Sequence, residues 1–309
     1  AAIPGDFSGP AVADPPDSPQ KRLAIMERYN VPIAELSGLA RVRPTADETE
    51  KLKFYGVGDA ADTVARMRIS ASDNAGIPIE EVAHMVGKTA KDIFQWEAIA
   101  ADGNDTVCML SEKRGEIACL DNDLQEDRGS FRLDVSTIGF VESAWKARPN
   151  SRGEGMILMK KGHVLVLKEK QPSMLIEFGP EGDAPMGYGA DTFLQEGEAF
   201  LGLCMDNQKP VYRAGQPTPS IRRRLVALKA WAFSEQLEKL ATDASDLTLG
   251  PDERIYMLSQ ESAVLVRLEK TLKPSEEKVR GEPGPDGNLP AGRENGAGRG
   301  ASRQTTPRR

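Results

Sequence analysis

Residues 76–97 read GIPIEEVAHMVGKTAKDIFQWE, and this stretch decides the fold that the sequence predicts. It reads as a helix, a tight turn at Gly87 and a second helix. A small residue, Ala83, stands where the first helix must approach the second closely. Gly87, four positions later, tolerates the positive φ that such a turn requires. Ile93 would then anchor the second helix, so the stretch predicts a compact helical unit.

The flanking core positions of this unit hold Val82, Val86 and Trp96. With its Glu-Glu-hydrophobic-Ala run and its Trp-Glu ending, the segment resembles the phage-repressor type of helix-turn-helix over residues 62–101. The resemblance implies that the second helix begins near Thr89 and enters a DNA major groove. Lysines there would neutralise phosphates, and polar side chains would read base edges. The implied contact residues are Lys88, Thr89, Lys91 and Gln95.

The charge of the same segment supports a second interpretation. Residues 76–101 hold two lysines against Glu80, Glu81, Asp92 and Glu97, so the unit is acidic. Affinity for DNA depends largely on the neutralisation of phosphates. A helical hairpin that packs a core or docks a protein is therefore the alternative, and both interpretations stay open.

The two ends of the chain differ from its centre in composition. Residues 1–20 contain five prolines and few large apolar residues, which predicts a disordered arm. Residues 273–309 predict a disordered basic tail, because residues 291–309 carry five arginines against one glutamate although the whole chain has a net charge of -7. Such a tail can hold RNA, DNA or an acidic protein surface, or remain solvated. Its candidate contact residues are Arg299, Arg303, Arg308 and Arg309.

Between residues 104 and 272 the apolar period changes to two, which predicts β-hairpins. They include hairpins at residues 106–120, 156–167 and 255–268, the first with Gly115 at the third position of its loop. The hairpins recur about every 50 residues, as in a propeller-type repeat. The intervening segments share no pattern, however, and residues 220–241 predict one long amphipathic helix. The sequence therefore favours an α+β fold. A helical domain at residues 21–103 would carry the helix-turn-helix, and a hairpin-rich barrel or sandwich with the long helix would follow it.

Part of this hairpin-rich region resembles a second family. Residues 156–167 (MILMKKGHVLVL), 176–183 (IEFGPEGD) and 197–201 (GEAFL) are followed by the predicted long helix. Together they are similar to a cyclic-nucleotide-binding β-roll over about residues 156–241. The resemblance implies that Gly197, Glu198 and Ala199 hold a ribose and a phosphate, with Arg213 as the candidate phosphate-binding arginine. A plain β-barrel or sandwich is the alternative.

Patterns for metal binding and covalent catalysis are weak. The chain has two histidines, and neither has a partner at ligand spacing or a nucleophile motif around it. The sequence therefore predicts no metal, no cofactor and no enzyme. Three cysteines are an odd, sparse set that favours a reducing compartment. With a three-residue hairpin loop, Cys108 and Cys119 would point to opposite faces, so no disulfide is expected between them.

These features predict a non-enzymatic, regulatory nucleic-acid-binding protein that uses the helix-turn-helix and the basic tail. A homo-oligomer would supply the avidity that one acidic module lacks. The alternative is a structural subunit of a virion or another large assembly, held together by its terminal arms. No apolar run approaches the ~18 residues that span a membrane. We therefore expect no membrane partner and a cytoplasmic location, or a virion if the alternative holds.

Overall fold

β-Strands form nearly all of the regular structure in the part of the chain that the structure describes. The computed structural model describes residues 2–3, 21–23, 31, 33–41, 52–59, 63–69, 79–84, 95–102, 104, 106–125, 127–195, 197–200 and 222–268. Within these ranges four antiparallel sheet segments follow one another along the chain, with two short α-helices between them. The predicted α+β class with a helical N-terminal part is therefore wrong.

The first sheet occupies the region for which helices were predicted. It is an antiparallel meander of four strands in chain order. Its strands are β3 (Leu36–Arg41), β4 (Leu52–Gly58), β5 (Thr63–Ile69) and β6 (Ile79–His84). Ala83, the expected helix contact, lies in β6 and pairs with Val64 of β5. The helix-turn-helix prediction is wrong because a short apolar run fits a buried strand as well as a helix.

The second sheet repeats the meander and is buried on both faces. Its strands are β7 (Trp96–Ala101), β8 (Thr106–Ser111), β9 (Glu116–Asp121) and β10 (Asp127–Asp134). Every residue of β8 is buried. Alternate side chains of a strand point to opposite faces. Val107 and Met109 accordingly join one hydrophobic cluster, and Cys108 and Leu110 join another.

The β8–β9 hairpin holds a disulfide that the sequence analysis did not expect. Ser111 pairs with Glu116, so the loop has four residues rather than three, and Cys108 stands directly opposite Cys119. The two cysteines form a disulfide and are fully buried. The expectation of unbridged cysteines is therefore wrong, because a one-residue change of register moves a side chain to the other face. Disulfides of this kind persist mainly in oxidising environments, which opposes the expected reducing compartment.

The third sheet contains the segment that was expected to be a long helix. The helix α1 (Gly139–Ala147) leads into it from β10. Its strands are β11 (Gly155–Leu158), β12 (Val164–Lys168), β13 (Met174–Pro180) and β14 (Arg222–Ala232), with a 3-10 turn at Lys160–Gly162. β14 is an eleven-residue strand that also pairs in parallel with β10, so the second and third sheets share one hydrogen-bonded ladder. The prediction of one long helix at residues 220–241 is therefore wrong for residues 222–232, whereas residues 235–240 are helical.

The fourth sheet closes the described part of the chain. The helix α3 (Glu235–Leu240) precedes it, with Ser234 as N-cap. Its strands are β15 (Asp246–Leu249), β16 (Ile255–Ser259) and β17 (Val264–Arg267), with β1 (Ala2–Ile3) and β2 (Lys21–Arg22) at its edge. None of the helices in the described ranges is long and apolar enough to cross a bilayer.

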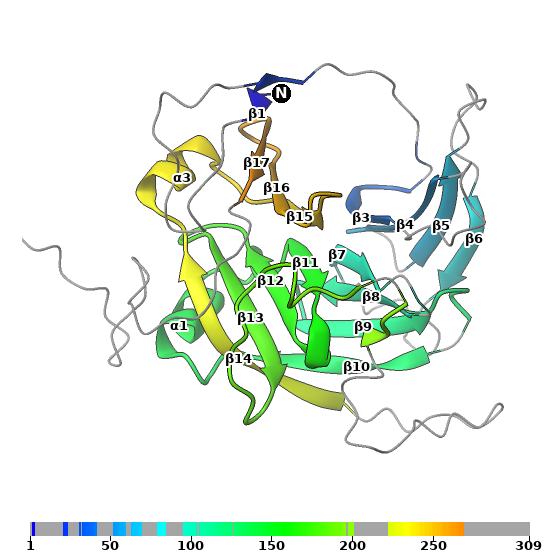
Figure 1. The fold of residues 1–309 in the computed structure, drawn as a ribbon, viewed down its shortest axis with the longest axis horizontal. Coiled ribbons are helices and arrows are strands. Elements are labelled where there is room, and N and C mark those ends of the chain that lie inside the picture. Colours follow the sequence, from blue (N-terminus) through cyan, green and yellow to red (C-terminus); the bar gives the residue numbers. More distant parts are fainter. Residues whose placement is uncertain are drawn as a thin grey trace, which may run out of the picture.

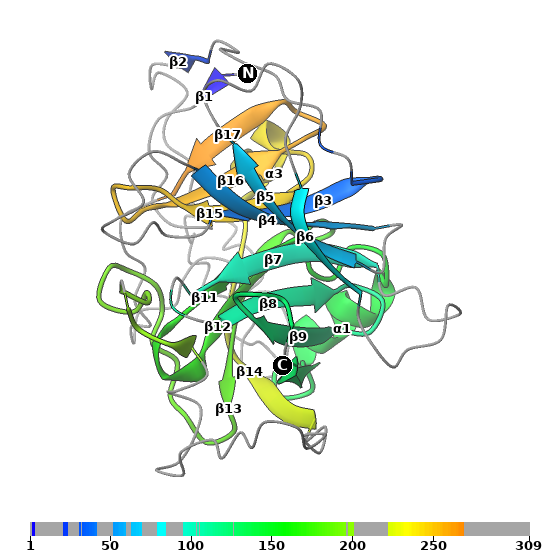
Figure 2. The same cartoon turned by 90° about the vertical axis from the view of Figure 1, so that its right-hand side faces the viewer.

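The four sheet segments are arranged around a common centre, and the second and third are the two halves of one eight-stranded sheet. The first strands of the sheets, β3, β7, β11 and β15, gather in the middle, and the later strands of each sheet lie progressively further out (Figure 1). β3 packs against β7, β7 against β11, and β11 against β15. The view turned by 90° shows the first sheet crossing above β7 with the fourth sheet beyond it (Figure 2). We call β3, β7, β11 and β15 the inner strands.

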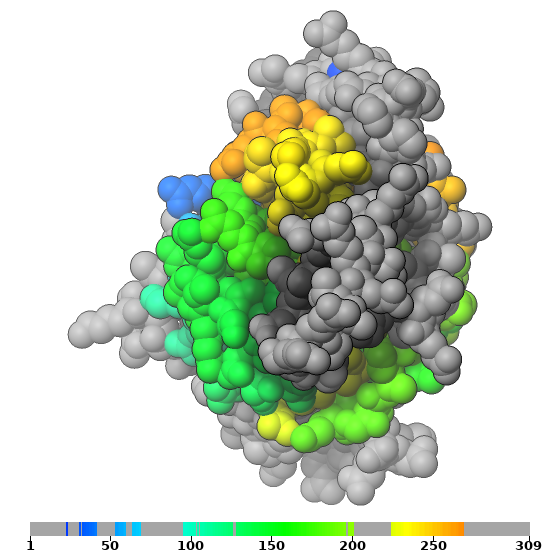
Figure 3. Space-filling model, turned by 90° about the vertical axis from the view of Figure 1, so that its left-hand side faces the viewer, coloured from blue at the N-terminus to red at the C-terminus, as the bar shows by residue number. Residues whose placement is uncertain are grey.

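The hydrophobic core lies in the interfaces between successive sheets. One buried cluster lies between the first and second sheets, one between the second and third, and one between the third and fourth. In the space-filling view the yellow and orange atoms of α3 and the fourth sheet lie directly on green atoms of the preceding segment (Figure 3). The second and third sheets are thus covered on both faces, which explains their continuous apolar runs.

Two glycines allow the inner strands to approach each other closely. A Cβ on Gly38 of β3 would lie 2.9 Å from the carbonyl oxygen of Glu97 in β7. A Cβ on Gly155 of β11 would lie 2.6 Å from the backbone nitrogen of Leu247 in β15. Only a residue without a side chain fits at such contacts. The glycines therefore set the spacing of the inner strands at the centre of the molecule.

Candidate functional site

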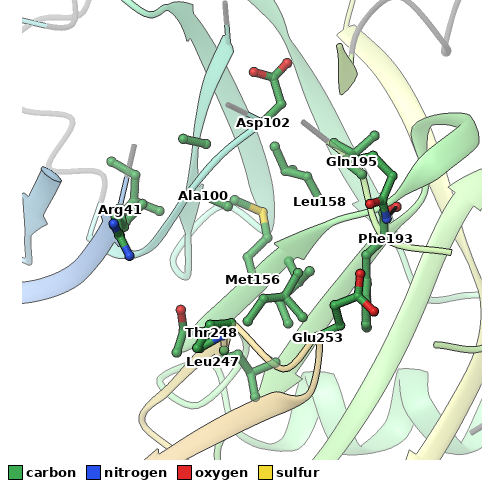
Figure 4. A pocket seen from close by; sticks show the side chains of 18 of the residues that line it. Arg41, Ala100, Asp102, Met156, Leu158, Phe193, Gln195, Leu247, Thr248 and Glu253 are labelled. Atoms are coloured by element: carbon green, nitrogen blue, oxygen red, sulfur yellow. Dashed lines mark hydrogen bonds between the residues drawn. The ribbon is translucent and has the colours of Figure 1, made fainter. Parts of the chain in front are cut away.

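A cavity of about 360 Å³ lies where the inner strands end. Its walls are residues 39–41 of β3, 99–101 of β7, 156–158 of β11 and 247–249 of β15. Residues 193–195 and the turn after β15 complete it (Figure 4). Because each of the four sheets contributes its inner strand, the cavity depends on the assembled fold rather than on one local motif.

The floor of the cavity is apolar. Met156 stands near its middle, with Leu158 and Phe193 on one side and Leu247 on another (Figure 4). Leu39 is 40% exposed and lines the same space. An exposed large apolar side chain inside a concave, otherwise well-packed region is typical of ligand pockets.

Charged groups line the rim rather than the floor. Arg41 ends β3, and Glu253 lies in the turn between β15 and β16. Both side chains are exposed, and neither makes a hydrogen bond or ion pair with another residue that the structure describes. The two side chains stand on opposite sides of Met156 and Leu247 (Figure 4). They are therefore free to meet a ligand.

Asp102 also lines the cavity, but its carboxylate is already occupied. Oδ1 accepts hydrogen bonds from the backbone nitrogens of Asn104, at 2.9 Å, and Thr106, at 3.1 Å. Oδ2 accepts a third from the backbone nitrogen of Phe200, at 3.0 Å. Asp102 is 2% exposed. It therefore ties the β7–β8 turn to the segment at Phe200 and is not offered to a ligand.

A buried carboxylate holds the loop that forms one wall. Glu177 of β13 is fully buried and accepts hydrogen bonds from the backbone nitrogens of Met186 (2.7 Å) and Gly187 (2.9 Å). His163 lies between two acids, with Nδ1 2.7 Å from Glu177 Oε1 and Nε2 3.2 Å from Asp183 Oδ2. We call Glu177, His163 and Asp183 the loop clamp.

From the loop clamp the chain runs back to the cavity. The backbone nitrogen of Lys160 donates to the carbonyl oxygen of Thr192 at 2.9 Å, and Met159 forms a β-bridge with Phe193. These contacts fix Phe193 beside the end of β11. The loop clamp is thus a structural device that shapes the pocket, and no nucleophile contacts it among the described residues.

The opposite ends of the inner strands carry a group of acids. Burial, with help from the nearby Asp59 and Glu112 carboxylates, raises the pKa of Glu97 to about 7. Burial, together with neighbouring carboxylates, raises the pKa of Glu154 to about 9, and burial raises that of Asp246 to about 7. No group of His, Cys, Asp and Glu in the described ranges is arranged to hold a metal ion. We therefore treat these acids as a determinant of stability rather than as a binding site.

Of the predicted nucleic-acid contacts, Gln95 lies in the part of the chain that the structure describes. Gln95 directly precedes β7, and its carbonyl oxygen accepts a hydrogen bond from the Glu112 backbone nitrogen at 3.0 Å. The other predicted contacts, Lys88, Thr89, Lys91, Arg299, Arg303, Arg308 and Arg309, lie outside the described residues. The strand β6 occupies the expected first helix, and β7 begins at Trp96, inside the expected second helix. The helix-turn-helix hypothesis of DNA binding is therefore wrong. The virion-subunit alternative is corrected as well, because nothing in the β-rich described structure supports it.

The β-roll resemblance is wrong as well. Its long helix is the strand β14, which pairs with β13 and β10. Glu198 is engaged locally: its Oε2 accepts from the Gln195 backbone nitrogen at 2.7 Å and lies 3.7 Å from Lys160 Nζ. Arg213 lies outside the described residues. The segment thus lacks the arrangement that the resemblance implied.

Comparisons with known proteins are sparse. No family model and no curated protein sequence matches the chain. Among solved structures, the chain is similar to a protein from Bacteroides uniformis that is provisionally assigned as a 6-phosphogluconolactonase, with a TM-score of 0.33 and 6% identity. The match covers 77% of this chain and 55% of that chain, so this chain spans little more than half of its length. A likeness at this level carries no argument about function.

None of the residues that line the cavity was a predicted site residue. Arg41 is some two hundred positions away from Thr248 and Glu253, and the three residues belong to no local motif. One signal was present: the inner strands β3, β7 and β11 begin at Leu36, Trp96 and Gly155, at nearly equal intervals. The helix wrongly expected at β14 interrupted this repeat and hid it.

Proposed function

We propose that this protein binds a small molecule in the cavity between its four inner strands. The supporting observation is the cavity itself, whose volume of about 360 Å³ is within the range of small-molecule sites. It combines an apolar floor at Met156 and Leu158 with a few rim groups that can orient a ligand. A site between sheets that the whole fold positions is a usual place for such binding.

Binding without covalent catalysis is the form of this function that the lining favours. The described lining residues include no histidine, cysteine, serine, lysine or tyrosine. Nucleophilic catalysis needs a nucleophile within reach of a general base. The buried acid at the cavity, Asp102, is occupied by three backbone donors. The expected absence of enzymatic activity therefore remains part of the proposal, as does a homo-oligomeric state.

A ligand screen on the full chain tests the proposal. Methyl-labelled methionine gives a direct readout, because Met156 stands at the middle of the cavity (Figure 4). We expect small molecules that bind to shift the Met156 methyl resonance, assigned with Met156→Leu. The variant Thr248→Trp places a large ring in the cavity from an exposed position of β15 and should abolish the shift.

The matched control is Leu258→Trp on the neighbouring strand β16. Leu258 is 43% exposed and does not line the cavity. Ligands should bind this variant as they bind the natural chain, and both variants should keep the same circular dichroism spectrum. Hits that are insensitive to Thr248→Trp, or a screen that never moves the Met156 methyl group, would overturn the proposal.

A further inference from the structure

The two free charges at the cavity are of opposite sign and lie apart. Arg41 closes one side of the rim, and Glu253 stands on the other, with Met156 and Leu247 between them (Figure 4). The third charged residue that lines the cavity is Asp102, whose carboxylate accepts hydrogen bonds from three backbone nitrogens. The cavity therefore offers a ligand one cation and one anion, separated by an apolar floor.

Asp252, the other acidic residue of the turn that carries Glu253, makes contacts within the protein. Asp252 accepts a hydrogen bond from the Tyr256 hydroxyl at 3.0 Å and lies 3.6 Å from Arg267 Nη1. Glu253 contributes only backbone bonds to the turn, with its nitrogen donating to the Gly250 carbonyl oxygen at 3.0 Å. The side chain of Glu253 thus adds nothing to the turn within the described structure.

The backbone at Glu253 adopts a conformation that favours glycine. Its φ is 58°, in the left-handed region that is uncommon for residues with a side chain. Seven non-glycine residues in the described ranges have positive φ, and of these Glu253 lines the cavity. An uncommon backbone conformation at a concave site suggests a functional role for its side chain, here that of Glu253.

From this arrangement we propose that the cavity takes a short, linear zwitterion, with its negative group at Arg41, its positive group at Glu253 and an apolar stretch over Met156. A short apolar peptide or an ω-amino acid has this chemistry. The proposal rests on the proposed function, because it names the class of ligand for the same cavity. Charge complementarity at a rim contributes more to specificity than to affinity.

Four probes with six carbon atoms each test the class of ligand: aminohexanoate, hexanoate, hexylamine and hexanol. Binding to the full chain is followed by the Met156 methyl shift. We expect aminohexanoate to bind tightest. Arg41→Gln should weaken its binding roughly threefold to fivefold, as for other exposed charge pairs, and should leave hexylamine unchanged. Glu253→Gln should weaken it to a similar extent and leave hexanoate unchanged.

Two comparisons separate a binding role from a merely structural one. The control variants Arg132→Gln on β10 and Glu235→Gln on α3 remove charges far from the cavity and should leave all four affinities unchanged. Glu253→Gly should raise the midpoint of thermal unfolding, because glycine relieves the positive φ, and yet weaken aminohexanoate binding.

The outcomes distinguish this inference from the proposed function. If hexanol binds as well as aminohexanoate and neither charge variant matters, the zwitterion inference fails while cavity binding stands. The inference also fails alone if ligands found in the general screen shift the Met156 methyl group and none of the four probes does. If no compound of any kind reaches Met156, the proposed function fails and the inference fails with it.

Discussion

Gly155 and Gly38 stand at the two contacts where a side chain would meet the backbone of a neighbouring inner strand. A flexible neighbouring side chain can move aside for an added methyl group, but a strand backbone held by its own ladder cannot. At Gly155 the obstructing atom is the backbone nitrogen of Leu247, 2.6 Å from an added Cβ. The two glycines therefore act through packing, and conformational freedom is secondary.

The first prediction concerns Gly155. Gly155→Ala should lower the free energy of unfolding by about 1–3 kcal/mol, because the new methyl group forces β11 and β15 apart. The control is Gly139→Ala at the start of α1, where an added Cβ meets nothing within 4 Å. There alanine should be neutral or stabilise by up to ~1 kcal/mol through its helix propensity. Urea titrations measure both changes, and equal effects at the two sites would contradict the packing argument.

At the residue scale the sequence predicted where strands lie better than which residues pair across them. The hairpin strands at residues 106–110 and 116–120 are confirmed as β8 and β9, and Gly115 has the expected positive φ of 58°. The loop between them was assigned one residue too few, and this error alone separated Cys108 from Cys119. Because the side-chain period of a strand is two, a single-residue error inverts every facing relation.

At the scale of the elements, burial on both faces explains the main error. β14 lies between β13 and β10, and its residues 225–227 and 230–232 are buried. An alternation of polar and apolar residues is absent from such a strand, so its apolar spacing fits a helix equally well. The hairpins at 156–167 and 255–268 were predicted correctly because tight turns with glycine or polar residues mark their ends.

The second prediction concerns the loop clamp. Glu177→Gln replaces one acceptor oxygen by an amide that faces the backbone donors of Met186 and Gly187. We expect a loss of about 3 kcal/mol in the free energy of unfolding, as for a buried donor left unpaired next to a lost charge. Hydrogen exchange at residues 186–193 should accelerate more than exchange in β8.

Glu181→Gln is the matched control for the loop clamp. Glu181 pairs with Arg224 on the surface, and its side chain is 68% exposed. An exposed ion pair contributes little, so this variant should stay within ~1 kcal/mol of the natural chain. Unchanged exchange of residues 186–193 in Glu177→Gln would show that other contacts hold the loop. In that case Lys160 and Phe193 would be the residues to examine.

At the scale of the whole molecule, the cavity could not be predicted from sequence because no segment contains it. Its walls come from four strands that are brought together only when the sheets pack. Residues that form recognisable local patterns, such as Gly87 and Lys88, instead predicted a helix-turn-helix. The nearly equal intervals between the starts of β3, β7 and β11 are the trace of repeated four-stranded units in the sequence.

The last prediction concerns the pH dependence of the whole molecule. Burial raises the pKa of Glu154 from 4.5 to about 9 and that of Glu97 to about 7. Between the unfolded and folded pKa values the folded state binds more protons than the unfolded state. The free energy of unfolding should therefore be highest near pH 5 and fall as the pH rises to 8, by about 1.4 kcal/mol per pH unit for each extra proton.

Above pH 8 another buried group opposes this trend. Burial lowers the pKa of Lys168 to about 8, so the folded state then binds fewer protons at that site, and the decline should flatten. Glu154→Gln keeps the shape of the protonated acid and removes its titration. It should raise stability at pH 8 and make the slope between pH 5 and 8 shallower by up to about 1.4 kcal/mol per unit.

The control for this pH series is Glu235→Gln on α3, where the side chain is 82% exposed and carries no raised pKa. It should leave the slope between pH 5 and 8 unchanged. Urea unfolding at half-unit intervals measures all three proteins. A natural chain whose stability is flat or rises over this range would contradict the assignment of buried protons to the ends of the inner strands. A Glu154→Gln variant with the original slope would instead place the proton on Glu97 or Asp246.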